Sequence, residues 1–226
     1  MKIGVLGTGI VGRTVSERLA ELGHEVRVGT RDPAATLERS APDAFGNPPF
    51  SEWLAAHPAI VLDTFAEVAA HGELLVNATV GSGAVPALEL AGGAALAGKV
   101  LMDLSNPLDF SKGMPPSLTI CNTDSLGETI QRTFPALRVV KTLNTVTARL
   151  MVHPRELANG AHTIFVSGND GAAKATVTEL LRTFGWQDIV DLGDITTARG
   201  TEMMLPIWVR LWSVTKTPMF SFQLVR

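Results

Sequence analysis

Residues 2–12 read Lys-Ile-Gly-Val-Leu-Gly-Thr-Gly-Ile-Val-Gly, an apolar run followed by closely spaced glycines. The run over residues 2–6 is typical of a short buried strand. Beyond the glycines, apolar side chains recur at the spacing of one helix face: Val11, Val15, Leu19 and Leu22. Gly23 is expected to end that helix, and residues 25–28 predict a second short strand. The chain therefore opens as strand, glycine turn, helix and strand.

The glycines form a complete G-x-G-x-x-G pattern, directly after a strand and at the start of a helix. In that context the first glycine permits the tight turn, the second lets the backbone approach a pyrophosphate, and the third lets the helix pack on the strand. The free N–H groups and the positive end of the helix dipole favour phosphate. The alternative is an ordinary tight turn. We predict a dinucleotide site that uses the whole loop: Gly7, Thr8, Gly9, Ile10, Val11 and Gly12.

Apolar runs alternate with helical patterns along the rest of the chain. Strands are expected over 59–63, 74–78, 99–103, 138–143, 163–167 and 188–192, with helices between them and a last helix over 196–215. Helix-start signals stand at Asp32-Pro33, Thr64, Ser125 and Asp170. This alternation predicts an α/β fold, a Rossmann-type doubly wound parallel sheet with helices on both faces. We predict a dinucleotide-binding domain over 1–143 and a small carboxyl-terminal α/β lobe over 144–226, for dimerisation or for covering the substrate.

Two stretches rich in proline interrupt the alternation. Residues 41–50 and 104–117 contain three prolines each and predict loops, and a loop as long as the second is usually functional or mobile. A helix is expected around 85–97, after a turn over 81–83. Residues 220–225 alternate apolar and polar side chains, which favours an edge strand.

The end of the second strand indicates which dinucleotide binds. An NAD site places an acidic residue there to hold the ribose 2′-hydroxyl. Here the strand ends in Thr30 and Arg31. Thr30 can donate to a 2′-phosphate, and Arg31 can bond it twice and stack on the adenine. Asp32 competes for the ribose, but its place before Pro33 marks it as a helix cap. We predict NADP(H).

Polar residues follow two further predicted strands, at Asn77-Ala78-Thr79 and at Asn106-Pro107. In an open parallel sheet, ligands bind beyond the carboxyl ends of the strands near the switch point. These residues are therefore expected to flank the nicotinamide half of the cofactor. The alternative is that they only form turns.

The composition excludes several classes of protein. The 226 residues (24.0 kDa) carry 19 basic and 22 acidic side chains, so no basic excess is available for nucleic acid. No run approaches the ~20 apolar residues of a membrane span. We expect no secretory signal, and the single cysteine allows no internal disulfide, which favours a reducing, cytoplasmic location. The histidines lack metal-ligand spacing, so no metal site is predicted.

The motif, the Gly-Thr-Arg after the second strand, and Val-Lys-Thr-Leu-Asn at 140–144 resemble the family of NADPH-dependent deazaflavin-coenzyme reductases, which includes the cytosolic domain of membrane ferrireductases. The resemblance implies a Rossmann domain with a small carboxyl-terminal lobe, often dimeric. It implies that Thr8, Thr30 and Arg31 hold the 2′-phosphate. It also implies a floor, where nicotinamide meets the second substrate, made of Asn106, Pro107, Thr142, Leu143 and Asn144. The segment 41–58 looks like an insertion relative to the family.

Three functions remain open at this point. The first is hydride transfer between NADPH and a deazaflavin or flavin, with apolar groups near Met204 and Pro206 covering the acceptor. The second is reduction of a small ketone or imine, which needs a proton donor; Lys141 and Lys112 are the candidates. The third is an NADP(H)-binding sensor without turnover. No catalytic residue can be assigned from the sequence.

Overall fold

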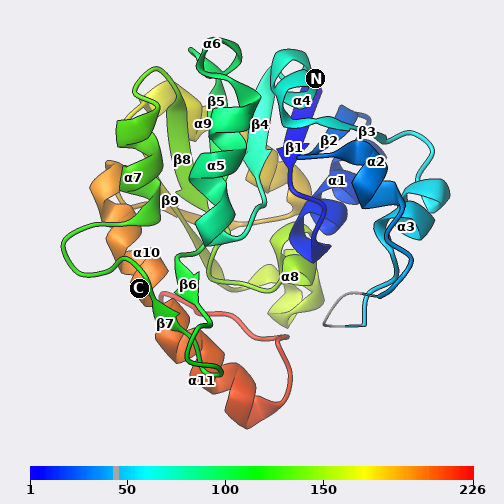
Figure 1. The fold of residues 1–226 in the computed structure, drawn as a ribbon. Helices are drawn as coiled ribbons and strands as arrows, with labels where there is room; N and C mark the ends of the chain where they lie inside the picture. The colour runs from blue at the N-terminus through cyan, green and yellow to red at the C-terminus, as the bar shows by residue number, and fades with distance from the viewer. Residues whose placement is uncertain (43–45) are drawn as a thin grey trace.

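Eight strands form one sheet through the centre of the protein (Figure 1). The computed structural model describes residues 1–42 and 46–226. The strands of this sheet are β1 (Lys2–Leu6), β2 (Glu25–Thr30), β3 (Val61–Thr64), β4 (Leu74–Asn77), β5 (Val100–Asp103), β8 (Arg138–Thr142), β9 (Thr163–Ser167) and β10 (Asp188–Asp191). Among the described residues they lie in the order β10-β9-β8-β5-β4-β1-β2-β3. The chain winds outward from β1 to β3 and returns to β4 on the other side, so the predicted doubly wound fold is confirmed.

One junction departs from the predicted parallel sheet. β9 pairs antiparallel with β8, with Thr142 opposite Val166, whereas the remaining pairs are parallel. This register places Thr163, the start of β9, beyond the end of β8. The connection holds only α8 (Ala148–Val152) and two short 3-10 turns over 154–156 and 158–160, so it stays at the carboxyl edge of the sheet. A strand that starts where its neighbour ended has to run the other way.

Helices cover both faces of the sheet, as predicted (Figure 1). One face packs against α1 (Ile10–Glu21), α8 and α9 (Gly171–Phe184), with α3 (Phe50–Ala56) at its margin. The other packs against α4 (Phe65–His71), α5 (Gly81–Ala91), α6 (Gly93–Leu96), α7 (Leu126–Thr133) and the start of α10 (Ala198–Met203). Because helices bury both faces of the sheet, the central strands are apolar on both sides, as at Val5 and Val76, which have no exposed surface.

The helix starts follow the predicted caps, with one difference. Asp32 caps α2 (Pro33–Leu37) through the N–H of Ala35 at 3.0 Å, and Thr64 forms a complete capping box for α4. Ser125 caps α7 as predicted, but the carboxylate of Glu128 does not return to the backbone N–H of Ser125. Asp124 accepts that N–H instead, which leaves Glu128 available for an ion pair with another helix.

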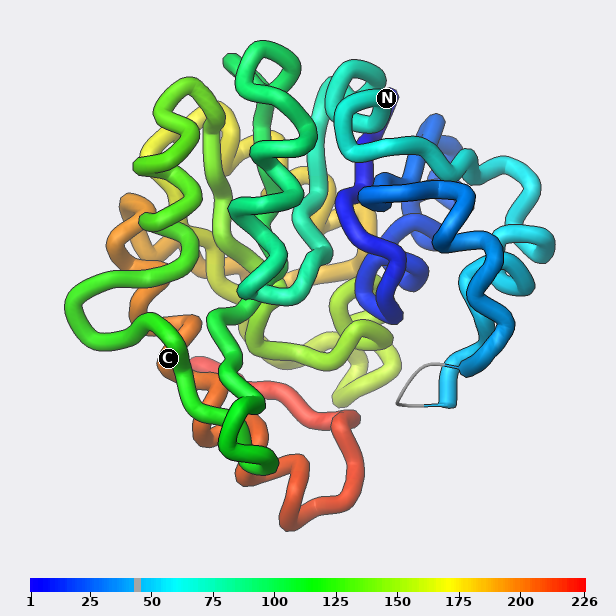
Figure 2. The backbone as a smooth tube through the Cα atoms, viewed as in Figure 1, coloured from blue at the N-terminus to red at the C-terminus, as the bar shows by residue number. Residues whose placement is uncertain are grey.

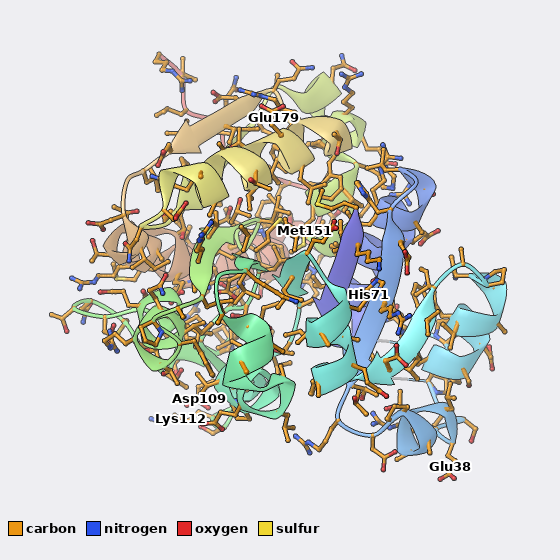
Figure 3. The ribbon with its side chains drawn as sticks, turned by 90° about the horizontal axis from the view of Figure 1, so that it is seen from above. Glu38, His71, Asp109, Lys112, Met151 and Glu179 are labelled. Carbon is orange, nitrogen blue, oxygen red and sulfur yellow. The ribbon has the colours of Figure 1, made fainter. Side chains whose placement is uncertain are left out.

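Two other expectations, for the helix over 85–97 and for the loop over 104–117, were wrong in detail. The helix predicted at 85–97 begins at Gly81, because its first turn packs against the carbonyl of Asn106, where a Cβ at position 81 would lie 2.0 Å from that oxygen. The loop 104–117 contains β6 (Leu108–Asp109), which pairs antiparallel with β7 (Ser117–Leu118). Figure 3 shows Asp109 and Lys112 of this hairpin together at the outer edge of the protein.

The predicted edge strand over 220–225 does not form. After α11 (Leu205–Thr215) the tail returns toward the sheet, as Figure 2 shows. It accepts one backbone hydrogen bond, from the N–H of Thr163 to the oxygen of Phe222 at 2.9 Å. The tail thus reaches β9, which β8 and β10 already flank, and not one of the two end strands of the sheet, β10 and β3.

Two predictions about organisation stay open. The sheet continues without a break past residue 143, and the division into domains 1–143 and 144–226 remains a prediction. The predicted loop 41–50 includes residues 43–45, which lie outside the described residues. The remainder of the 41–58 segment contains α3, which begins at Phe50, the last residue of the predicted loop.

Candidate functional site

The glycine turn lies at the switch point of the sheet, between β1 and β4. Gly7 has a φ of +119°, a conformation that L side chains rarely adopt. A Cβ on Gly12 would lie 2.0 Å from the carbonyl oxygen of Gly7, so the helix can approach the strand only with glycine there. A Cβ on Gly9, the N-cap of α1, would meet no atom within 4 Å. Each glycine therefore has the role that the motif predicts for it. Gly7 makes the tight turn, Gly9 leaves the backbone open to a ligand, and Gly12 lets the helix pack closely on the strand.

Of the pockets around this turn, two reach the loops after β4 and β5. The glycine-loop pocket lies between residues 7–9, Thr30, Arg31, Arg39 and residues 78–80, among others. The strand-end pocket lies between Val11, residues 78–82, residues 104–106, Leu108 and Phe110. Together they bring the glycine motif, the end of β2 and the loops after β4 and β5 to one edge of the sheet. This is the edge at which the topology places a ligand.

Arg13 fixes the outer side of the turn, a role that the sequence did not indicate. Its Nε donates to the carbonyl oxygen of Thr8 at 2.9 Å, and its Nη1 donates to that of Pro48 at 2.6 Å. Its guanidinium lies 5.3 Å from the centre of the Phe50 ring. Arg13 thus links the glycine turn to the segment before α3. No local pattern marks this residue, because its partners come from a distant part of the chain.

The residues predicted to select NADP lie together at the end of β2. Arg31 is exposed and makes no hydrogen bond or ion pair within the described residues. The hydroxyl of Thr30 is buried and lies 2.9 Å from that of Thr36, whose own hydrogen goes to the carbonyl oxygen of Asp32. Arg39 also reaches Thr36, at 3.4 Å, and lines the pocket. Arg31 and Arg39 therefore place two positive charges where the strand ends.

The loops after β4 and β5 are joined by a buried hydrogen-bond network. Asn77 Nδ2 donates to Asp103 Oδ1 at 2.7 Å, and the hydroxyl of Ser105 donates to the same oxygen at 2.7 Å. The hydroxyl of Thr79 in turn donates to Asn77 Oδ1 at 2.7 Å. Of these four residues, Thr79 and Ser105 line the strand-end pocket, and Asn77 and Asp103 lie behind them.

Lys141, a candidate proton donor, is fully buried and ion-paired. Its Nζ lies 2.7 Å from Asp103 Oδ2 and 2.9 Å from Glu202 Oε1, and it donates to the carbonyl oxygen of Ser105 at 2.7 Å. Burial alone lowers the pKa of Lys141, but the two carboxylates outweigh it and raise the pKa above its ordinary value. Lys112 lies exposed at the hairpin tip. Neither lysine lines the strand-end pocket.

The residues expected around the second substrate are only partly brought together. Asn106 and Asn144 hydrogen-bond to each other, and Asn106 lines the strand-end pocket. Leu143 has no exposed surface and a φ of +59°, which is unusual for leucine. The hydroxyl of Thr142 is used inside the sheet, where it donates to the carbonyl oxygen of Phe165.

The remaining predicted positions lie at the surface or against the hairpin. Pro107 is buried at the base of β6, with its carbonyl accepting from Thr119. Met204 is half-buried at the junction between α10 and α11, and Pro206 is exposed on the first turn of α11. Neither is among the residues that line the strand-end pocket. Phe110, which sequence reasoning did not select, does line it and is 55% exposed.

A sheet wound outward from β1, with an open glycine turn at its switch point, defines a domain of the dinucleotide-binding class. The sequence profile described as "NADP oxidoreductase coenzyme F420-dependent" matches residues 2–107. A crystal structure from Arthrobacter sp. FB24, described as a "putative f420 dependent nadp-reductase", is 61% identical, with 100% of each chain covered and a TM-score of 0.96. The chain belongs to the F420-dependent NADP oxidoreductase family and is an NADP-dependent oxidoreductase.

More distant proteins share parts of this pattern. Metalloreductase STEAP3 of Rattus norvegicus is 30% identical over 213 residues, which are 92% of this chain but 38% of that protein, so the chain spans well under half of its length. An imine reductase of Aspergillus terreus is 17% identical, covers 95% of this chain and 62% of its own, and has a TM-score of 0.62; it shares the fold. Within residues 1–42 and 46–226, no helix combines the length and apolarity that a bilayer crossing requires.

Proposed function

We propose that the chain transfers hydride between NADPH and a second flat redox cofactor, a deazaflavin in the first place or a flavin. The phosphates would lie at the glycine turn, where a Cβ on Gly9 would enter the space they need. The nicotinamide ring would lie in the strand-end pocket. The 2′-phosphate would lie against Arg31, with Arg39 beside it and with Thr30 once its bond to Thr36 opens.

The observation that carries this proposal is the lining of the strand-end pocket. None of its described residues has an ionisable side chain. Reduction of a ketone or an imine needs a proton donor beside the reacting carbon, and Lys141 is held by two carboxylates out of reach. Hydride transfer between stacked rings needs positioning and the exclusion of water instead. The apolar side chains of Val11, Leu104 and Phe110 suit a flat ring.

The test is steady-state oxidation of NADPH under anaerobic conditions with a panel of acceptors. The deazaflavin coenzyme, flavin mononucleotide and flavin adenine dinucleotide are compared with a cyclic imine and a simple ketone. We expect turnover with the deazaflavin, seen as loss of its visible absorbance. Turnover of only the imine or the ketone would overturn the proposal, as would turnover of none of them by protein that binds NADPH.

A variant locates the reaction in the strand-end pocket. Asn106→Trp fills that pocket and is expected to lower turnover strongly while the phosphate contacts still hold NADPH. Thr176→Trp, on the exposed outer face of α9, is the matched control and should leave turnover unchanged. Homodimer formation, a cytoplasmic location and a covering role for residues 144–226 remain predictions that sedimentation and localisation experiments can address.

A further inference from the structure

A buried cluster with unequal charges lies directly behind the strand-end pocket. Lys141 contacts Asp103 and Glu202, and the side-chain exposures of the three are 0%, 0% and 2%. One ammonium faces two carboxylates, so the cluster carries one negative charge in excess. Burying an uncompensated charge is costly, and a fold gains nothing from it that a neutral contact could not supply. Such a charge therefore calls for a functional reason.

The two carboxylates of the cluster have different surroundings. Glu202 accepts hydrogen bonds from the N–H groups of Leu126 and Gly127, at 2.8 and 3.0 Å, so the amino-terminal end of α7 offsets its charge. The other oxygen of the Asp103 carboxylate, Oδ1, receives only neutral donors, from Asn77 and Ser105. Lys141 is shared between the two carboxylates. Of the two carboxylates, Asp103 is the one hydrogen-bonded to a residue of the pocket wall, Ser105.

The Asp103 carboxylate, which is paired with Lys141, also fixes the direction of two hydroxyl groups. A carboxylate can only accept, so the Ser105 hydroxyl turns its hydrogen inward. Asn77 must present Nδ2 to Asp103, and this leaves its Oδ1 facing Thr79, which donates both its N–H, at 3.3 Å, and its hydroxyl. Two of the hydroxyls that line the pocket, those of Thr79 and Ser105, thus have their hydrogens turned away from it. They offer only oxygen lone pairs to a ligand.

We propose that Lys141, Asp103 and Asn77 act as positioning residues that make this wall electronegative, so that the pocket favours the oxidised, cationic nicotinamide over the reduced ring. The inference rests on the proposed placement of the nicotinamide in the strand-end pocket. Giving up hydride creates positive charge on the ring, and an oriented anion stabilises charge as it develops. The lone pairs of the Thr79 and Ser105 hydroxyls also suit a carboxamide NH2 group, which is a donor.

The decisive measurement is the ratio of two dissociation constants, Kd for NADP+ divided by Kd for NADPH, determined by calorimetry. Asp103→Asn removes the excess charge and turns an NH2 group toward Asn77 and Ser105. Removing a unit charge behind the wall should raise this ratio on the order of tenfold, because NADP+ loses an attraction that NADPH lacks. A purely structural role would change both constants by the same factor. Glu179→Gln, which removes an exposed carboxylate from α9, should leave the ratio unchanged.

A milder variant keeps the inference testable if Asp103→Asn does not fold. Thr79→Val removes one hydroxyl oxygen, a hydrogen-bond acceptor, from the wall; Thr79 makes no contact with the ion cluster, and the substitution should raise the ratio about two- to fivefold. Thr79→Ser keeps the hydroxyl and should restore the wild-type ratio. If every folded variant binds both nucleotides with the wild-type ratio of dissociation constants, this inference is overturned and the proposed function still stands. Failure of the wild-type chain to bind either nucleotide overturns the proposed function together with it.

Discussion

Asn106 and Asn144 lie 38 positions apart in the chain and hold each other by two hydrogen bonds. Asn106 Nδ2 donates to the carbonyl oxygen of Asn144 at 2.9 Å, and Asn144 Nδ2 donates to Asn106 Oδ1 at 3.0 Å. Asn144 Nδ2 also donates to the carbonyl oxygen of Thr201 in α10, at 3.1 Å. The pair therefore ties the loop after β5, the loop after β8 and α10 into one unit at the rim of the strand-end pocket.

Asn144→Ala should destabilise the protein by about 1–3 kcal/mol, because it leaves two buried acceptors, Asn106 Oδ1 and the Thr201 carbonyl, without this donor. Urea unfolding followed by circular dichroism measures the loss. Thr215→Ala, which removes an exposed side-chain hydrogen bond, is the control and should cost much less. Equal effects of the two substitutions would show that the asparagine pair is not a structural junction.

Arg31→Ala should remove most of the preference for NADPH over NADH. A charge-assisted hydrogen bond contributes roughly 1.5–3 kcal/mol, which corresponds to about 10–150-fold in affinity. NADH affinity should barely change, since Arg31 makes no contact within the described protein that the substitution would disturb. Calorimetric titration with each nucleotide gives the ratio, and Arg182→Ala on α9 is the control. A wild-type chain that binds both nucleotides equally would contradict the assignment to NADP.

Gly9→Val and Gly12→Val should fail in different ways. At position 9 a Cβ meets no atom of the protein, so the variant should fold with a wild-type melting temperature and lose nucleotide binding. At position 12 the Cβ would lie 2.0 Å from the Gly7 carbonyl oxygen, so that variant should be strongly destabilised. Thermal melts and NADPH titration separate the two effects. Undiminished NADPH binding by folded Gly9→Val would mean that the motif forms only a turn.

Local patterns were sufficient for the features that depend on neighbours in sequence. The glycine turn, the caps at Asp32 and Thr64 and the outward winding from β1 follow from spacing and helix-start chemistry, and the structure confirms them. The antiparallel direction of β9 could not be predicted from local patterns. Whether a strand runs parallel or antiparallel to its neighbour depends on the path of the connection between them, which the pattern does not contain. The hairpin over 108–118 was missed for a related reason: its strands contain only two residues each, too few to show a period.

The interior of the candidate site depended on tertiary contacts that no local pattern contains. Lys141 looked like an accessible proton donor because lysines are rarely buried. Its partners come from β5 and from α10, the second of them 61 positions further along the chain, counted as 202 − 141. The β8 pattern alone could have suggested burial, since Lys141 lies between apolar residues in a strand covered on both faces. The role of Arg13 had no such signal.

Glu128 on α7 and Arg199 on α10 form an ion pair whose pH dependence can be measured. Arg199 Nε donates to Glu128 Oε2 at 2.8 Å, and Nη2 donates to Oε1 at 2.5 Å. The hydrogen bonds from Arg199 first, and that from Ser125, outweigh burial and hold the pKa of Glu128 below its ordinary value of 4.5. A carboxyl whose pKa is depressed by folding stabilises the protein above its unfolded pKa, and this contribution is lost as the pH falls through the folded pKa.

Glu128→Gln should therefore cost about 1 kcal/mol at pH 7, a value limited by the partial exposure of Arg199. The difference from wild type should shrink as the pH falls below 4.5, because protonation then removes the same charge from the wild-type protein. Urea unfolding of both proteins between about pH 7 and pH 3 gives the difference free of other titrating groups. Glu179→Gln, whose partner Arg182 is exposed on α9, should show almost no cost at any pH. A Glu128→Gln cost that stays constant down to the lowest pH would mean that packing, and not the charge of the carboxylate, holds α7 to α10.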